Sequence, residues 1–266
     1  MGTLKQFYKR NTHNAFLKTL AGFGRSLNRL YENRNYDVHS NGEEVVLKKL
    51  SSFNPAIIID GGANIGDYSL LAGSHCPSAK IFSFEPVVST FKLLKHKTAN
   101  NKNIIAVNTG LYNTNKKQEI KIYDSHTHSS LYEIKGIDYS VQKTEVIELV
   151  SGDSFMHENK IEKIDFLKLD IEGAELHALQ GFEKALAENK IRMVQFEYGY
   201  INITTKNLLI DYYDFFKKHN YLIGKIYPGK VEFRNYKFKH EDFIGPNFIA
   251  LHASDSELQK SLSVRR

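Results

Sequence analysis

The 266-residue chain has only one cysteine and no long apolar run, and both scarcities narrow the class of protein. Cys76 has no second cysteine with which to form a disulfide within the chain, so we expect a buried thiol in a reducing compartment. No apolar run approaches the roughly 20 residues that span a bilayer, and the first residues lack the apolar segment of a signal peptide. We therefore expect a globular protein of the cytoplasm.

The net charge of +6 is concentrated at the N-terminus. Residues 1–41 carry seven basic side chains against two acidic ones, which leaves the remainder close to neutral. Apolar side chains recur there every three or four residues, as on one face of a helix: Phe16, Leu20, Phe23, Leu27 and Leu30. We expect a basic amphipathic extension that packs on the domain or on a second subunit, or lies on anionic lipid at the inner face of the membrane. Nucleic acid is not an expected partner, because no platform of aromatic and basic residues accompanies the charge.

The rest of the chain alternates short apolar segments with helical ones, which predicts an α/β fold. Strands are expected at residues 56–60, 80–85, 103–110, 164–170 and 191–199, with helices between them. Such alternation requires right-handed crossovers, and therefore a mostly parallel, doubly wound sheet covered on both faces. The segments 221–238 and 247–254 are expected to be two final strands that pair antiparallel.

This rhythm breaks between residues 110 and 164. Segments 118–124 and 144–150 alternate like exposed strands, so we expect a β-hairpin insertion over about 118–150, at the edge of the sheet. The predicted organisation is an extension at 1–41, a domain at 42–253 and a C-terminal tail at 254–266.

Polar residues end the predicted parallel strands. They are Asp60, Glu85, Gly110 and Asp170, with Glu197 near the end of the fifth strand. In open α/β sheets the ligand lies beyond the carboxyl ends of the strands. Four carboxylates are thus expected around one crevice.

The turn after the first strand reads Asp-Gly-Gly-Ala-Asn-Ile-Gly, residues 60–66. Gly61 and Gly62 are expected to permit positive φ and close backbone approach, and Gly66 to let the next helix pack tightly on the strand. The dinucleotide motif requires a glycine where Ala63 stands. Asp60 at the strand's end repels a pyrophosphate but can pair with a cationic amino group, directly or through water. S-adenosylmethionine is therefore favoured over NAD.

Glu85 lies 19 residues after Gly66 (85 minus 66), at the end of the next strand. A carboxylate there can accept hydrogen bonds from both ribose hydroxyls of an adenosine. The adenosine would continue toward Gly110 and Leu111.

Several blocks of the sequence resemble the FkbM-like methyltransferases. They are "IIIDGGANIGDYSLLA", "IFSFEPVVSTFKLLKHKTANN", "NTGLYN" and "IDFLKLDIEGAELHALQGFEKAL", within residues 43–200, and "SHTHSSL" is similar to a Ser-Ser-Leu element. The resemblance implies the class I, Rossmann-like fold of S-adenosylmethionine-dependent methyltransferases. It also implies an enzyme that usually methylates an oxygen, often on a sugar or a natural product. It implies cofactor roles for Asp60, Gly62, Asn64, Gly66 and Glu85, and a functional role for residues 170–175. "ELVSGDSF" is similar to a Leu-Asp-Ser element but has Ser151 and Gly152 before Asp153.

Methyl transfer to a hydroxyl needs alignment, exclusion of water and a base near the acceptor oxygen. Asp170 is the first candidate base, and Glu172 could raise its pKa or share the hydroxyl. Glu197, at the end of a buried strand, either binds the acceptor or pairs with a base. Glu175 and His177 are expected to serve mainly helix initiation and packing.

A divalent metal is an open alternative at the same acids. Asp170, Glu172 and Glu197 could hold Mg²⁺ through oxygen atoms, although nothing in the sequence fixes a ligand count. His126 and His128 lie in a polar loop and are expected to be solvated or to contact the acceptor.

The sequence thus predicts an S-adenosylmethionine-dependent O-methyltransferase acting on a saccharide, a glycolipid precursor or a natural product. The hairpin and the C-terminal strands would form the acceptor wall, with Tyr198 and Tyr200 stacking on a sugar ring. The alternatives are an NAD-dependent oxidoreductase and a non-catalytic scaffold at the membrane surface, and an oligomer is left open.

Overall fold

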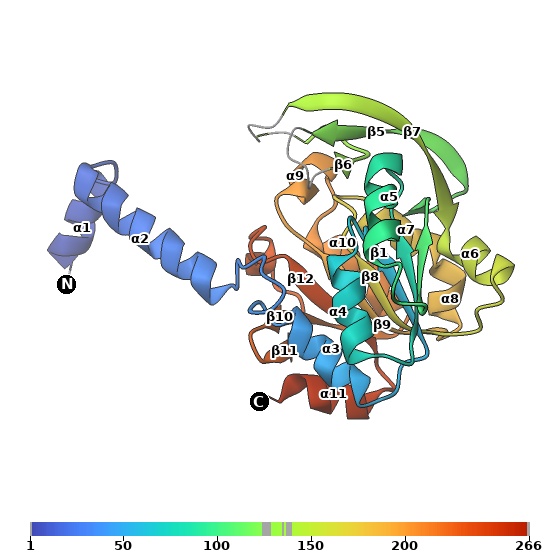
Figure 1. Ribbon diagram of the computed structural model, residues 1–266. Coiled ribbons are helices and arrows are strands. Elements are labelled where there is room, and N and C mark those ends of the chain that lie inside the picture. Colours follow the sequence, from blue (N-terminus) through green and yellow to red (C-terminus); the bar gives the residue numbers. More distant parts are fainter. Residues whose placement is uncertain (1, 124–128, 135, 137–139, 265–266) are drawn as a thin grey trace.

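The computed structural model describes residues 2–123, 129–134, 136 and 140–264. Within this part of the chain, eight strands form one sheet in the order β11-β10-β12-β9-β8-β1-β2-β3 (Figure 1). Their bounds are β1 Ile57–Gly61, β2 Lys80–Phe84, β3 Ile104–Val107, β8 Ile164–Leu169, β9 Ile191–Glu197, β10 Tyr221–Tyr227, β11 Lys230–Phe233 and β12 Asn247–His252.

The pairing confirms the predicted Rossmann-like sheet. Strands β3, β2, β1, β8 and β9 are parallel, and β12 lies antiparallel between β9 and β10. Strands β10 and β11 form an antiparallel hairpin, whereas the sequence pattern predicted a single strand over residues 221–238. The carboxyl ends of β1, β2, β8 and β9 therefore meet at one edge of the sheet.

Helices cover both faces because apolar residues alternate along each buried strand. Ile58 and Phe166 face one layer, and their neighbours Ile59 and Leu167 face the other. The first layer contains α3 Glu43–Ser51, α4 Asp67–His75 and α11 Ser256–Ser263, and the second contains α6 Gly152–Glu158, α7 Glu175–Gly181, α8 Glu183–Ala187 and α10 Leu209–Lys218. Helix α5 Val88–Lys97 packs beside β3, and the short helices α9 Ile201–Thr205 and η1 Phe238–His240 lie in connections.

Helix α11 lies within the segment that the sequence predicted as a C-terminal tail. Its Leu258 and Leu262 are fully buried beside α3 and β11. These residues therefore contribute to the core of the folded unit.

A second sheet stands over the carboxyl edge of the first. It has the order β4-β7-β5-β6, with β4 Gly110–Tyr112, β5 Lys116–Tyr123, β6 Ser129–Ser130 and β7 Val141–Ser151. Strands β5 and β7 pair antiparallel, which confirms the hairpin insertion. The predicted third strand is divided, because the side chain of Asn108 donates to the carbonyls of Glu85 and Pro86 and the chain changes sheets there. His126 and His128 lie outside the described residues.

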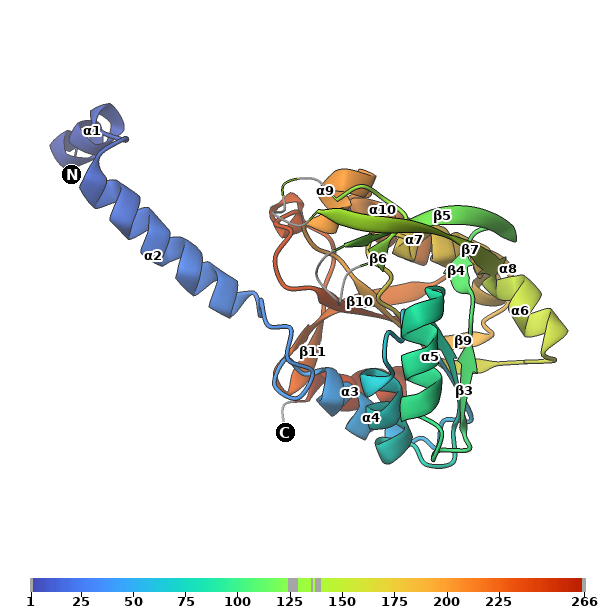
Figure 2. The same cartoon turned by 45° about the horizontal axis from the view of Figure 1, so that its top comes forward.

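The N-terminal extension is helical, as predicted, and projects from the domain (Figures 1 and 2). It consists of α1 Gly2–Arg10 and α2 Ala15–Tyr31. The five apolar side chains that define one face of α2 are between 50% and 78% exposed. The alternative in which this face packs on its own domain is therefore not what the structure shows. Among the helices of the described chain, none has the length and apolarity to cross a membrane.

Candidate active site

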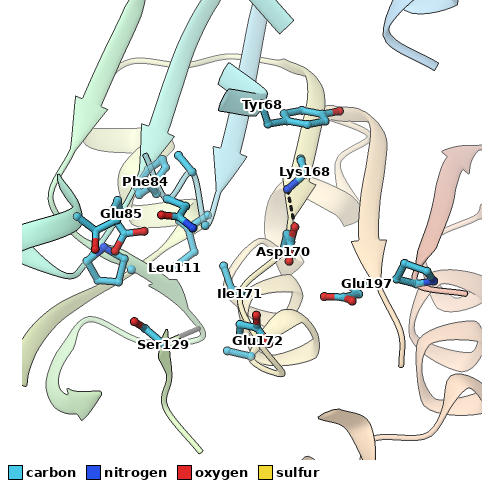
Figure 3. A pocket seen from close by; sticks show the side chains of 18 of the residues that line it. Tyr68, Phe84, Glu85, Leu111, Ser129, Lys168, Asp170, Ile171, Glu172 and Glu197 are labelled. Carbon is cyan, nitrogen blue, oxygen red and sulfur yellow. Dashed lines mark hydrogen bonds and ion pairs between the residues drawn. The ribbon is translucent and has the colours of Figure 1, made fainter. Parts of the chain in front are cut away.

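A pocket of about 770 Å³ opens at the carboxyl ends of β1, β2 and β8 (Figure 3). Small-molecule sites typically measure roughly 300–1,000 Å³. Most of the predicted site residues line this pocket: Gly62, Asn64, Glu85, Gly110, Leu111, Asp170, Glu172 and Glu197. Three of the four strand-end carboxyl groups expected around one crevice line this cavity, Glu85, Asp170 and Glu197, and Glu172 joins them. The fourth, Asp60, lies outside the lining, as do Gly61 and Gly66.

The glycine turn holds two segments of the pocket together. Gly62 has a φ of 82°, and a Cβ atom there would lie 1.8 Å from the carbonyl oxygen of Asp170. Only glycine permits this contact, which fixes the turn after β1 against the chain after β8. The expected positive φ at Gly61 was wrong, because this residue is the last of β1. Gly66, with a φ of 95°, packs against Leu94 of α5 rather than against the strand.

Glu85 stands at the carboxyl end of β2, beside the apolar side chains of Phe84 and Leu111 (Figure 3). Its Oε1 atom accepts a hydrogen bond of 2.9 Å from the Val87 amide. Burial raises the pKa of this carboxyl to about 7, against the opposing effect of backbone hydrogen bonds from Val87 and Asn64. A carboxylate with apolar neighbours at this strand end matches the chemistry of an adenosine.

Asp60 does not reach the pocket. It is fully buried, its Oδ2 accepts from the Ser69 hydroxyl at 2.6 Å, and its Oδ1 lies 3.9 Å from the Nζ of Lys168. Strand alternation turns Asp60 toward α4, where burial raises its pKa. Direct pairing of Asp60 with a ligand's amino group is therefore not supported, since Lys168 is its cationic neighbour.

Lys168 is a site residue that the sequence analysis did not identify. Its Nζ donates to Asp170 Oδ2 at 3.0 Å (Figure 3) and lies 4.7 Å from the centre of the Tyr68 ring. Burial alone lowers the pKa of Lys168, but the charges of Asp170, Asp60 and Glu43 raise it above its ordinary value. The lysine therefore stays charged and favours the ionised form of Asp170. The signal in the sequence was a lysine within an otherwise apolar strand, which requires a buried partner.

Three acids converge opposite Glu85: Asp170, Glu172 and Glu197 (Figure 3). Glu197 shares a hydrogen bond with Asp170, and burial followed by the charges of Asp170 and Glu172 raises its pKa well above the usual value. Burial and the charge of Asp170 likewise raise the pKa of Glu172. The group thus contains a carboxyl group hydrogen-bonded to the Lys168 ammonium and two carboxyl groups whose raised pKa favours the protonated form. Such an arrangement can accept a proton and donate hydrogen bonds within one cavity.

The turn that carries Glu172 is held by two other parts of the chain. Glu172 has a φ of 52°, an uncommon conformation for this residue type. The Oε1 of Glu175 accepts from the amides of Ile171 and Gly173 at 2.9 and 3.2 Å. Ser130, in the Ser-Ser-Leu element, donates its hydroxyl to the Glu172 carbonyl at 2.7 Å. The second sheet and α7 therefore fix the acidic turn.

Two other residues from the sequence analysis serve the fold. His177 stacks on Tyr112 with ring centres 4.9 Å apart, and its Nδ1 lies 3.1 Å from the Tyr132 hydroxyl, in agreement with the packing interpretation. Asp153 accepts 3.0 Å hydrogen bonds from the amides of Lys184 and Ala185 and so caps α8.

The expected acceptor wall supplies part of the lining. The second sheet contributes Ile120, Ser129, Ile147 and Leu149, and Leu131 follows directly after β6. The segment before β12 contributes Pro246. Tyr200 also lines the pocket, but Tyr198 is fully buried and donates to Glu241 at 2.6 Å. Stacking of Tyr198 on a sugar was therefore wrong. Residues Arg34, Tyr36 and Val38, which follow α2, line the pocket as well, and no sequence signal indicated this.

The magnesium alternative gains no support. In the part of the chain that the structure describes, no group of three or more His, Cys, Asp or Glu side chains has an arrangement that could hold a metal ion. Asp170 instead contacts Lys168 and Glu197.

The strand order, the antiparallel β12 and a pocket at the ends of β1, β2 and β8 define a Rossmann-like fold of the methyltransferase type. Residues 60–223 match the methyltransferase FkbM domain, and the chain belongs to this family. The resemblance seen in the sequence is thereby confirmed.

Two curated relatives share part of their length with this chain. The hexuronic acid methyltransferase AglP of Haloferax volcanii is 25% identical over 164 residues, which cover 59% of this chain and 64% of AglP. The methyltransferase sdnD of Sordaria araneosa is 28% identical over 160 residues, which cover 49% of this chain and 61% of sdnD. The matches thus span less than two thirds of each relative. The crystal structure of the methyltransferase FkbM from Methylobacillus flagellatus KT has a TM-score of 0.48 at 17% identity, over 74% of this chain and 44% of that chain.

Proposed function

We propose that this protein is an S-adenosylmethionine-dependent O-methyltransferase that acts on a hydroxyl of a saccharide or glycolipid precursor. The observation that carries the proposal is the single pocket shared by Glu85 on one side and by Asp170 and Glu197 on the other. The side of the pocket with Glu85 is suited to a nucleoside, and the side with Asp170 and Glu197 is suited to a reacting hydroxyl. Membership in the FkbM methyltransferase family supports the reaction class over an NAD-dependent oxidoreductase.

The charges of the lining fit a cationic donor. Six acids line the pocket, Glu43, Asp67, Glu85, Asp170, Glu172 and Glu197, against two bases, Arg34 and Lys168. Burial raises the pKa of four of these acids, Glu43, Glu85, Glu172 and Glu197, so the free pocket carries less negative charge than this count. A cationic sulfonium would favour the ionised form of these acids, whereas a pyrophosphate would be repelled by it. Glu85 would accept from the ribose hydroxyls, Leu111 would contact the adenine, and the backbone at Gly62 and Asn64 would border the methionine end.

S-adenosylmethionine, when bound, supplies a methyl group on a cationic sulfur that leaves as a neutral thioether. The Asp170 carboxylate would take the acceptor's proton as its oxygen attacks, because Lys168 keeps Asp170 ionised. Protonated Glu197 would orient Asp170 through their shared hydrogen bond. The apolar side chains of the second sheet would exclude water from this step.

The acceptor class is argued from the opposite wall of the pocket. The Asp170 carboxylate repels anionic groups. Glu172 and Glu197, whose raised pKa favours the protonated form, can donate hydrogen bonds to sugar oxygen atoms, so an uncharged sugar hydroxyl fits this wall better than a free carboxylate. The relative AglP is named for a hexuronic acid, which makes uronic acid sugars the informative comparison. A natural product with a free hydroxyl would present the same reacting group. The cytoplasm remains the predicted setting, and Cys76 is a buried free thiol.

The proposal is tested by titrating S-adenosylhomocysteine calorimetrically into the wild type and the Asp170→Asn variant. The wild type should then methylate one member of a panel of neutral and uronic acid glycosides, as measured by mass spectrometry. The variant should bind within about threefold of the wild type and lose at least roughly 100-fold in methyl transfer. Glu148→Gln, at an exposed acid of β7 outside the pocket lining, is the matched control. Binding of NADH in place of S-adenosylhomocysteine would refute S-adenosylmethionine as the methyl donor. Full activity of the Asp170→Asn variant would refute Asp170 as the catalytic base.

A further inference from the structure

Helix α2 presents two chemically distinct sides. At 3.6 residues per turn, the five apolar residues fall within an arc of about 80°; they are Phe16, Leu20, Phe23, Leu27 and Leu30. Lys18, Arg25 and Arg29 lie on the other side. Residues 1–31 contain six Lys and Arg side chains and no Asp or Glu. An exposed apolar stripe on an arm without acids is typical of helices that lie in the interface of an anionic bilayer.

The end of α2 is fixed to the domain rather than loosely tethered. Glu32 Oε2 lies 2.8 Å from the Nζ of Lys225, a lysine that is only 1% exposed. The side-chain amide of Asn33 donates to the carbonyls of Asn41 and Ile226 at 2.8 and 3.0 Å. A Cβ atom at Gly245 would lie 2.1 Å from the Glu32 carbonyl oxygen, so only glycine permits this contact. The direction of α2 is therefore set by the body of the protein.

The segment that follows this anchor enters the pocket. Arg34, Tyr36 and Val38 line it within seven residues of the end of α2. The arm and the mouth of the pocket thus belong to one continuous stretch of chain. A surface that binds α2 would lie close to the opening.

We propose that α2 docks the protein on an anionic phospholipid surface through its apolar stripe, with the pocket mouth near that surface. The apolar residues supply the affinity, and the cations of residues 1–31 select anionic lipid within a Debye length of about 8 Å. A second copy of the chain is the other occupant for such a stripe. One helix face offers far fewer residues than the roughly 20–30 a side of a stable protein interface. The charge and the size of the stripe both favour the lipid.

This docking has a consequence for the acceptor that rests on the proposed function. A pocket whose mouth lies at the bilayer is suited to a saccharide carried on a lipid. The acceptor class is thereby narrowed from free sugars to membrane-borne glycolipids.

The test is flotation of the full chain with vesicles of phosphatidylcholine alone or mixed with phosphatidylglycerol. The stripe variant carries Leu20→Gln, Phe23→Gln and Leu27→Gln, which keep helix propensity and remove apolar surface. The matched control carries Thr19→Gln, Ser26→Gln and Asn28→Gln, which change three exposed polar residues of the same helix. The wild type and the control should float with the mixed vesicles, and the stripe variant should bind them at least tenfold more weakly.

The position of the pocket is tested with an environment-sensitive fluorophore on Tyr36→Cys, while the buried Cys76 stays unlabelled. Mixed vesicles should shift the emission of this probe to shorter wavelength. A probe on Glu188→Cys, in the loop between α8 and β9, should not respond.

Three results would overturn the proposal. The first is that the wild type does not float with the mixed vesicles, and the second is that the stripe variant floats equally well. The third is that the wild type sediments as a dimer and the stripe variant as a monomer, which would assign the stripe to a second copy of the chain. An unresponsive probe at Tyr36 would overturn the placement of the pocket mouth. S-adenosylhomocysteine titration of the stripe variant keeps the two proposals separate, because the failure of docking leaves cofactor binding intact.

Discussion

The ribose role of Glu85 leads to a prediction that the structure makes quantitative. Glu85→Gln keeps the shape of the side chain, and its amide oxygen can still accept from the Val87 amide. The amide NH₂ group would then face the ribose hydroxyls, where the carboxylate had accepted. Hydrogen bonds to a charged group contribute roughly 1.5–3 kcal/mol each, so a loss of about 2–3 kcal/mol is expected. This corresponds to roughly 30- to 150-fold weaker binding of S-adenosylhomocysteine.

The raised pKa of Glu85 adds a pH dependence. The carboxyl of the free pocket has a pKa of about 7 because it is buried, and the ribose hydroxyls bind its ionised form. Affinity is therefore complete above pH 7 and is lost as the pH falls through 7. From pH 8 to pH 6 the wild-type affinity should fall about tenfold, with proton release on binding near pH 6. The Glu85→Gln variant should lack this dependence.

Isothermal titration calorimetry at pH 6, 7 and 8, in buffers of different ionisation enthalpy, measures both the affinity and the proton release. Glu148→Gln, at an exposed acid of β7 outside the pocket lining, is the matched control and should follow the wild type. Equal affinity of the wild type and Glu85→Gln would refute the ribose role. A pH dependence that persists unchanged in Glu85→Gln would refute its assignment to this carboxyl.

Three other predictions concern the acids and the turn. Lys168→Met should lower the free energy of unfolding in urea by about 3–5 kcal/mol, because Asp60 then stays buried without a neighbouring cation. Adding Asp60→Asn should recover part of this loss. Equal stability of the single and double variants would contradict an energetic coupling between Lys168 and Asp60. Gly62→Ala should abolish S-adenosylhomocysteine binding in calorimetry, because the new Cβ atom clashes with the backbone after β8. The control Gly24→Ala, whose Cβ atom meets nothing within 4 Å, should leave binding unchanged. Retained binding by Gly62→Ala would show that the turn adapts. The pKa of Glu197 is raised in the folded state, so this group reduces the stability of the fold as the pH rises above its pKa in the unfolded chain, near 4.5. Glu197→Gln should therefore raise the thermal midpoint at pH 8 more than at pH 5. Equal shifts of the midpoint at both pH values would contradict the raised pKa.

Much of the fold could be predicted because local patterns coincide with tertiary demands. Buried parallel strands need continuous apolar runs, and "AIIID" and "IDFLKLD" supply them directly. The strand ends therefore identified Glu85, Asp170 and Glu197 before their positions were known. Helices α3 and α11 were missed, because their short apolar faces carry little periodic signal and become meaningful only where they pack against one another.

The orientation of individual side chains could not be predicted in the same way. Asp60 and Lys168 are register partners on adjacent strands, and their side chains meet beneath the pocket. Tyr198 and Tyr200 are two residues apart, yet one is buried in the core and the other lines the cavity. A shift of one position reverses the face of a strand residue, and a bend after the strand changes it again, so only the three-dimensional path decides.

The sequence by itself determined the layered α/β architecture, the family and the set of acids at the strand ends, because strand burial and the glycine turn are written in contiguous residues. Only the tertiary structure decided which of these acids share a cavity, that Lys168 sets their charge, and that the segment after α2 lines the opening. The contacts that fix these properties include pairs more than 100 positions apart, such as Asp60 with Lys168 and Glu32 with Lys225. Even the contact of Lys168 with Asp170, two positions along, depends on the burial of the strand. Such contacts leave no local pattern, because their energy depends on burial that exists only after the chain has folded.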